Sequence, residues 1–300
     1  MAENKKNKNT ENPGTENAPE KKGFLKNLFS KKSADASYEY SQSYDYSQQS
    51  GQSKRTVRLV GEESNFAMRE AYKTGRTNIV FALPEEESSV LLLTSSWPME
   101  GKTTNCANLA VAFAQTGSKT LLLDCDLRKP RIHRIFKINT KLGLTNVLRK
   151  FCSIEEAVVH TSYDNLDILT SGHIPPNPGE LLGSPEMKEL IEELKKTYRY
   201  IIIDTPPVNM LSDAIILSPL VSGTALVVRQ GITDHKSITE DLDKMKFAGV
   251  KILGFILNDT TDPQGNYYNR SKKYSYKKNY YGKYYYNSGY YGTPSKTEKK

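Results

Sequence analysis

The hydrophobic residues in the middle of this chain gather in six short runs. The runs are nearly continuous in Val, Ile and Leu, which is typical of strands buried on both faces of a parallel sheet. They cover residues 90–96, 119–124, 166–172, 200–204, 224–229 and 251–258. Helical patterns lie before and between them at residues 63–80, 103–115, 185–197 and 235–247. This alternation predicts an α/β fold with a mostly parallel sheet and helices on both faces.

The two ends of the chain lack these patterns. Residues 1–58 are rich in Lys, Asn, Glu, Ser and Gln, and residues 266–300 are rich in Tyr, Lys, Asn and Gly. Neither segment has the spaced aliphatic residues that would compensate for the entropy lost on ordering. We therefore expect disordered terminal segments at 1–58 and 266–300. Residues 59–265 are expected to form one domain of roughly 200 residues, which is enough for a substantial core.

Charge is divided along the chain in the same way. Residues 266–300 contain nine basic residues and one acidic residue, a net charge of +8, whereas residues 60–265 contain 22 basic and 26 acidic residues, a net charge of −4. A nucleic-acid-binding domain usually carries positive charge on the fold itself, so no nucleic-acid partner is expected. The three cysteines lack metal-ligand spacing, and no apolar run approaches the ~20 residues of a membrane span. These features predict a soluble, cytoplasmic protein.

The segment LLLTSSWPMEGKTTN carries the first motif with recognisable chemistry. A buried strand ends at Ser95, and Gly101-Lys102-Thr103-Thr104 begins a helix. The N–H groups at such a helix start face an anion, while the lysine reaches the outer phosphates and the threonine hydroxyl binds Mg²⁺. Ser96 stands at the first glycine position of the phosphate-loop pattern, which leaves an ordinary turn as the alternative. The strand–loop–helix setting favours a phosphate loop.

Acidic residues end two further strands. Asp124 and Asp126 follow one strand with Cys125 between them, and alternate residues of an extended chain share a face. Such a pair suits Mg²⁺ coordination or acceptance of a hydroxyl proton. Asp204 ends the strand YIIID and predicts a second Mg²⁺-orienting carboxylate. A turn-forming role is the alternative for a single Asp, but ligands of parallel α/β folds gather at such strand ends.

Together these motifs resemble those of the bacterial tyrosine autokinases of capsule and exopolysaccharide synthesis. The resemblance rests on the phosphate loop, the patterns Φ-Φ-Φ-D-x-D-x-R and Φ-Φ-Φ-D-x-x-P, and a tyrosine-rich C-terminus. The stretches LRKPRIHRIF, GLTNVL and IPPNPGELLGSPEM extend it. It implies a P-loop NTPase fold, ATP and Mg²⁺ as cofactors, and autophosphorylation of the tail between the subunits of a homo-oligomeric ring. It also implies a cognate tyrosine phosphatase and a separate transmembrane activator that recruits the protein to the inner face of the plasma membrane.

The motifs and the resemblance together assign roles to individual residues. The candidate catalytic residues are Lys102, Asp124, Asp126 and Asp204. The candidate nucleotide-binding residues are Met99, Glu100, Gly101, Lys102, Thr103, Thr104 and Asn258, and the candidate metal ligands are Thr103, Asp124 and Asp204. An oligomerisation helix would present Glu70, Lys73 and Arg76, where Lys73 replaces an arginine. The tail would accept phosphate at Tyr280, Tyr281, Tyr284, Tyr285, Tyr286, Tyr290 and Tyr291.

Several of these residues leave alternatives open. Met99 stands where the family usually has glycine, so the loop either keeps negative φ there or is strained. Asn258 resembles the adenine-contacting Asn of related ATPases, and a plain turn residue is the alternative. The stripe formed by Glu70, Lys73 and Arg76 on the oligomerisation helix could instead be a solvated face. Asp213 and Arg229 lie near predicted strand ends and could line the substrate cleft, but solvated surface charge is the favoured interpretation of each.

The leading hypothesis is an ATP-dependent protein-tyrosine kinase that phosphorylates its own tail and regulates capsular or exopolysaccharide synthesis or export. One alternative is a switch ATPase of the partition or division-site type, without protein kinase activity. Another is a scaffold whose basic Tyr/Lys tail binds polyanions. A switch ATPase would have no use for the tyrosine tail, and a scaffold would not depend on Lys102.

Overall fold

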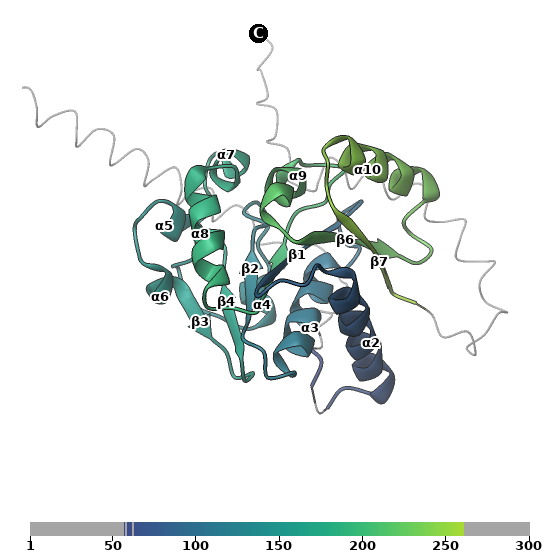
Figure 1. Cartoon of the computed structure of the whole chain (residues 1–300), viewed down its shortest axis with the longest axis horizontal. Helices are drawn as coiled ribbons and strands as arrows, with labels where there is room; N and C mark the ends of the chain where they lie inside the picture. The colour runs from purple at the N-terminus through teal and green to yellow at the C-terminus, as the bar shows by residue number, and fades with distance from the viewer. Residues whose placement is uncertain (1–56, 58, 62, 261–300) are drawn as a thin grey trace, which may run out of the picture. The chain divides into compact units, whose positions relative to one another are not determined.

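The computed structural model describes residue 57, residues 59–61 and residues 63–260 of the chain (Figure 1). The predicted terminal segments, apart from residue 57, and the candidate phosphoacceptor tyrosines lie outside these residues. The described residues form a seven-stranded sheet with the order β3-β4-β2-β5-β1-β6-β7. Neighbouring strands are parallel except for β3 and β4, which are antiparallel. The mostly parallel α/β sheet predicted from the apolar runs is therefore confirmed.

Each of the six predicted runs coincides with a strand, and one short strand was not predicted. The strands are β1 Ser89–Ser95, β2 Thr120–Asp124, β3 Val158–His160, β4 Leu166–Leu169, β5 Tyr200–Asp204, β6 Gly223–Arg229 and β7 Ile252–Asn258. The prediction that every strand is buried on both faces is wrong for β7. This strand lies at the sheet edge, where Phe255 and Leu257 are half exposed.

The four long helices also match their predicted positions. The helical elements are α2 Phe66–Ala82, α3 Lys102–Ala114, α4 Ile132–Ile135, α5 Leu144–Leu148, α6 Ile154–Ala157, α7 Pro178–Leu182, α8 Pro185–Lys195, α9 Asp213–Leu217, the 3₁₀ helix η2 Ser218–Leu220 and α10 His235–Phe247. Helices of one turn leave no readable period in the sequence, which is why the short ones were not predicted. Within the described ranges, no helix is both long and apolar enough to cross a membrane.

The helices cover both faces of the sheet (Figure 1). Leu91 and Leu93 of β1 pack in a cluster with α2, α3 and α4, whereas Val90 and Leu92 pack in a cluster with α5, α7, α8 and α9. Helix α10 packs on β6 at the end of this second face. Successive strand residues point to opposite faces, so one continuous apolar run supplies both hydrophobic layers.

The strand order brings the charged strand ends to one edge of the sheet. Strand β5 lies between β1 and β2, and its final residue Asp204 pairs in register with Asp124, the final residue of β2. On the other side of β1, the ends of β6 and β7 pair Arg229 with Asn258. Because these strands are parallel, the phosphate loop after β1 lies between the carboxylates and this second pair of residues.

Candidate active site

The loop between β1 and α3 bends through two left-handed residues. Gly101 precedes α3 with a φ of 93°, and Met99 has a φ of 69°. The left-handed conformation costs a non-glycine residue about 1–2 kcal/mol. The loop is therefore strained at Met99, and the alternative of negative φ there is wrong. The Met99 side chain is exposed, so hydrophobic burial does not explain its conformation.

Asn258 supports the loop from the end of β7. Its side-chain amide donates a hydrogen bond to the carbonyl oxygen of Glu100 at 2.8 Å. A Cβ atom built on Gly101 would lie 2.0 Å from the same amide nitrogen. Glycine at position 101 is thus required both by its positive φ and by the space that Asn258 occupies. Asn258 is not a plain turn residue, because it contacts the predicted phosphate loop directly.

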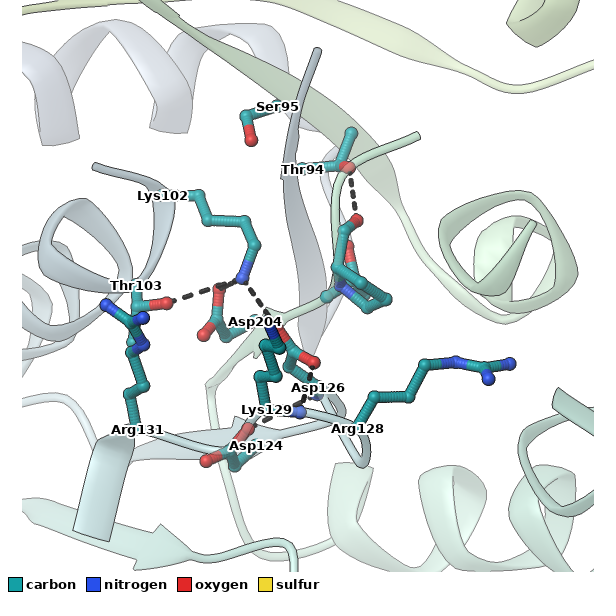
Figure 2. A network of polar contacts seen from close by, with 12 residues as sticks. Thr94, Ser95, Lys102, Thr103, Asp124, Asp126, Arg128, Lys129, Arg131 and Asp204 are labelled. Carbon is teal, nitrogen blue, oxygen red and sulfur yellow. Dashed lines mark hydrogen bonds and ion pairs between the residues drawn. The ribbon is translucent and has the colours of Figure 1, made fainter. Parts of the chain in front are cut away.

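Lys102 and two of the predicted catalytic acids meet in one buried cluster. The Nζ atom of Lys102 lies 3.0 Å from Oδ2 of Asp126, 3.3 Å from Oδ1 of Asp204 and 3.4 Å from Oγ1 of Thr103. Figure 2 shows the lysine side chain extending from the start of α3 toward these carboxylates. The lysine and both acids are buried. The sequence prediction that these residues share one site therefore agrees with their geometry.

Asp124 lies next to this cluster (Figure 2). Its carboxylate accepts hydrogen bonds from the backbone N–H groups of Asp126, at 3.2 Å, and Ile132, at 3.3 Å. Burial raises the pKa of Asp124 well above its ordinary value, and the nearby carboxylates of Asp204 and Asp126 raise it further. Burial also raises the pKa of Asp204, against the opposing effect of Lys102. Three acids facing one lysine make a site that favours an additional cation.

The geometry limits how a metal could be held. Among the described residues, no three Asp, Glu, His or Cys side chains form a group able to hold a metal ion. Oδ2 of Asp204, however, is buried without a hydrogen-bond partner in this part of the chain. Mg²⁺ typically takes one or two carboxylates together with water and substrate phosphates. The site fits that kind of metal binding better than a cage made of protein ligands alone.

The segment after β2 carries three basic residues close to the cluster, Lys129, Arg131 and Arg128. The backbone N–H of Lys129 donates to Asp126 at 3.0 Å, and Nη1 of Arg131 lies 3.9 Å from the sulfur of Met99 in the phosphate loop. Arg128 points away and pairs with Asp213 at 3.3 Å. The expectation that Asp213 is a solvated surface charge is wrong, because it is buried at the start of α9. Burial raises the pKa of Asp213, and Arg128 opposes that rise.

The sequence prediction missed part of the loop's surroundings. The carboxylate of Glu100 is buried and accepts hydrogen bonds from the Trp97 N–H at 2.9 Å and the Thr233 hydroxyl at 2.5 Å. Burial raises its pKa to about 7. Arg229 was expected to be solvated but is partly buried, and it donates to the Met99 carbonyl oxygen at 3.1 Å. A charged residue ending a buried strand was the signal used for Asp124, and it applies equally to Arg229.

The remaining predicted site residues lie on α2 and α3. Lys73 pairs with Glu70 at 2.8 Å on the surface of α2. Arg76 donates instead to the carbonyl oxygen of Ala112 in α3 at 2.9 Å. Thr104, in the first turn of α3, is partly exposed. The predicted stripe on α2 therefore consists of one internal ion pair and one arginine that joins the two helices.

Comparison with known proteins identifies the family. A family described as an AAA domain matches residues 100–230. The chain is 46% identical over 189 residues to tyrosine-protein kinase YwqD of Bacillus subtilis, which covers 63% of this chain and 80% of that protein. It is 35% identical over 210 residues to the putative tyrosine-protein kinase CapB of Staphylococcus aureus, which covers 70% of this chain and 92% of that protein.

Solved structures agree with these relatives. The chimerical protein CapA2B2 has a TM-score of 0.62 and 34% identity, covering 69% of this chain and 96% of that one. The kinase domain of the Escherichia coli tyrosine kinase ETK has a TM-score of 0.61 and 33% identity, covering 66% and 80%. These relatives do not favour the switch-ATPase or scaffold alternatives, since they are named as tyrosine kinases or kinase domains. The resemblance noted from the sequence is confirmed, and the chain belongs to the bacterial tyrosine-protein kinase family.

Proposed function

We propose that this chain is an ATP-dependent protein-tyrosine kinase that phosphorylates its own tail between subunits. Residues 59–265 would form the kinase domain, and residues 266–300 would be the tail that carries the acceptor tyrosines. The observation that carries this proposal is the meeting of Lys102, Asp126 and Asp204 at the start of α3. Phosphoryl transfer depends mainly on positioning and charge neutralisation, and this site supplies groups for both.

The loop and the start of α3 suit a nucleotide phosphate. A helix N-terminus combines free N–H groups with a favourable dipole for anions. Lys102 contacts carboxylates in this structure, and its flexible side chain would turn toward the outer phosphates of ATP. Thr103, Asp124 and Asp204 would hold Mg²⁺, and the unpartnered Oδ2 of Asp204 supports this assignment because a buried carboxylate oxygen normally has a partner. When bound, Mg²⁺ would neutralise charge that develops on the phosphates.

Asp126 is the acid best placed to accept the proton of a tyrosine hydroxyl. Asp124 and Asp204 are both assigned to the metal, and the oxygens of Asp124 also accept hydrogen bonds from backbone N–H groups. Asp126 instead contacts Lys102 through Oδ2 and the Lys129 N–H through Oδ1. Movement of Lys102 toward a phosphate would remove its contact with Oδ2. Asp126 would then take the proton as the tyrosine oxygen bonds to the transferred phosphorus and ADP leaves.

The resemblance also supports proposals about partners and location. Glu70, Lys73 and Arg76 would join neighbouring subunits into a ring that presents each tail to the next active site. A separate transmembrane activator would recruit the protein from the cytoplasm to the inner face of the plasma membrane. A cognate phosphatase would reverse the tail phosphorylation. The cycle would regulate capsular or exopolysaccharide synthesis or export.

One experiment tests the kinase proposal directly. The full chain is incubated with ATP and Mg²⁺, and mass spectrometry maps the residues that gain phosphate. Phosphate is expected on the tail tyrosines of the original chain, and none in the Lys102→Met and Asp204→Ala variants. Lys188→Met is the matched control, because Lys188 is exposed on α8. Undiminished phosphorylation in both site variants would contradict the kinase site, and ATP hydrolysis without tyrosine phosphorylation would favour the switch ATPase.

A further inference from the structure

We propose that Arg229, braced by Asp259, is a positioning residue that holds Met99 in its left-handed conformation and thereby keeps the phosphate loop in its binding shape. This role depends on the proposed function only for the identity of the bound anion. The part of the proposal that concerns the support of Met99 depends only on contacts between described residues. Neither Arg229 nor Asp259 would contact the reacting atoms.

The guanidinium of Arg229 is held from one side and directed at the loop on the other. Its Nε and Nη2 atoms donate to Oδ2 of Asp259 at 2.9 Å and 2.7 Å. Its Nη1 atom donates to the carbonyl oxygen of Met99 at 3.1 Å. The planar, rigid fork of an arginine allows these bonds to be made together. The Arg229–Asp259 pair therefore restricts where the Met99 carbonyl can point.

The backbone around this pair is also well anchored. The Arg229 N–H donates to the Thr233 hydroxyl at 2.8 Å, and the same hydroxyl donates to the carboxylate of Glu100. The Gln230 N–H donates to the carbonyl oxygen of Asn258 at 3.0 Å, which ties the end of β6 to the end of β7. The backbone from which the Arg229 side chain extends is therefore held by hydrogen bonds.

Met99 needs such support because its conformation is unfavourable by itself. Its φ of 69° lies in the left-handed region, and its side chain is 57% exposed. Glycine would adopt this φ without penalty. A charge-assisted hydrogen bond is stronger than one between neutral groups, so the bond from Arg229 is well suited to offset the strain. We call the Arg229–Asp259 pair, with its bond to the Met99 carbonyl, the clamp. The clamp explains how this loop accepts a methionine where the family resemblance leads us to expect glycine.

The clamp also determines the direction of the loop's N–H groups. In a planar trans peptide the carbonyl oxygen and the next N–H point to opposite sides. Arg229 holds the carbonyl of Met99, and Asn258 holds the carbonyl of Glu100. The N–H groups of Glu100 and Gly101 must therefore point away from Arg229 and Asn258. Successive N–H groups arranged around left-handed residues form an anion-binding concavity, so the clamp shapes the phosphate site from its outer side.

A double-mutant cycle between Arg229→Gln and Met99→Gly tests the clamp. Affinity for a fluorescent ADP analogue in the presence of Mg²⁺ is measured first. Arg229→Gln should weaken binding roughly tenfold when Met99 is present, and by much less in the Met99→Gly background, since glycine needs no support. Asp259→Asn should give a smaller loss, because Arg229 keeps its length and charge but loses its brace. Arg149→Gln, at an exposed site after α5, controls for the change in net charge.

Urea denaturation of the same variants supplies a readout that needs no ligand. Arg229→Gln should lower the unfolding midpoint more in the Met99 chain than in the Met99→Gly chain. Equal losses of both affinity and stability in the two backgrounds, or no loss in either, would overturn the clamp. If the original chain binds no ADP, the proposed nucleotide site fails, and the stability cycle still decides whether Arg229 supports Met99.

Discussion

Replacement of Gly101 by alanine should reveal how tightly the phosphate loop packs against β7. Gly101 has a φ of 93°, and a Cβ atom there would lie 2.0 Å from Nδ2 and 3.1 Å from Cγ of Asn258. The left-handed backbone costs alanine about 1–2 kcal/mol. Displacement of the Asn258 amide would also remove its hydrogen bond to Glu100, which contributes about 0.5–1.5 kcal/mol. We expect Gly101→Ala to lower the free energy of unfolding by about 2–3 kcal/mol.

Gly117→Ala is the matched control for this substitution. Gly117 has a φ of 82°, but a Cβ atom there would meet nothing within 4 Å. Both substitutions change the unfolded chain alike, so the difference between them isolates the contact with Asn258. Urea denaturation followed by circular dichroism should show a larger loss at Gly101 by about 1 kcal/mol. Adding Asn258→Ala to Gly101→Ala should remove the steric conflict between the new Cβ atom and the amide of residue 258. Equal losses at the two glycines would refute the reasoning.

Three further outcomes are expected. Burial raises the pKa of Glu100 to about 7 from its ordinary 4.5, so its contribution to stability is present below pH 4.5 and is lost as the pH rises through about 7. Relative to Glu100→Gln, the original chain should therefore lose up to about 3 kcal/mol over this window in denaturation at stepped pH. Arg128→Met leaves the carboxylate of Asp213 buried without its guanidinium partner and should cost about 2 kcal/mol in a urea titration. At Gly143, a Cβ atom would lie 2.3 Å from the backbone nitrogen of Gly172. Gly143→Ala should therefore cost more than about 3 kcal/mol, seen as a lower thermal midpoint.

Much of the site could be predicted because its residues follow a local rule. Lys102 begins a helix after a buried strand, and Asp124 and Asp204 each end an apolar run. Arg229 also ends an apolar run, but a single arginine matched no motif and was assigned to the surface. Asp213 was misassigned because its burial depends on α9 and on Arg128, whose contact with it follows no spacing in the chain. The chemistry of a motif can be read locally, whereas the burial of a lone charge cannot.

The sequence by itself determined six of the seven strands in the described part of the chain, the long helices and the family. These features depend on apolar runs, helical periodicity and motifs that occupy a few consecutive positions. The tyrosine-rich tail is known from the sequence alone, because it lies outside the residues that the structure describes.

Only the tertiary structure decided how the phosphate loop is held. Glu100 meets Thr233 across 133 positions, Met99 meets Arg229 across 130, and Asn258 meets Glu100 across 158. The order of the strands creates these contacts by placing β6 and β7 next to β1. The exposure of β7 has the same origin, since an apolar run does not show whether its strand will be central or at an edge. Strand order results from packing the whole domain, which no local pattern encodes.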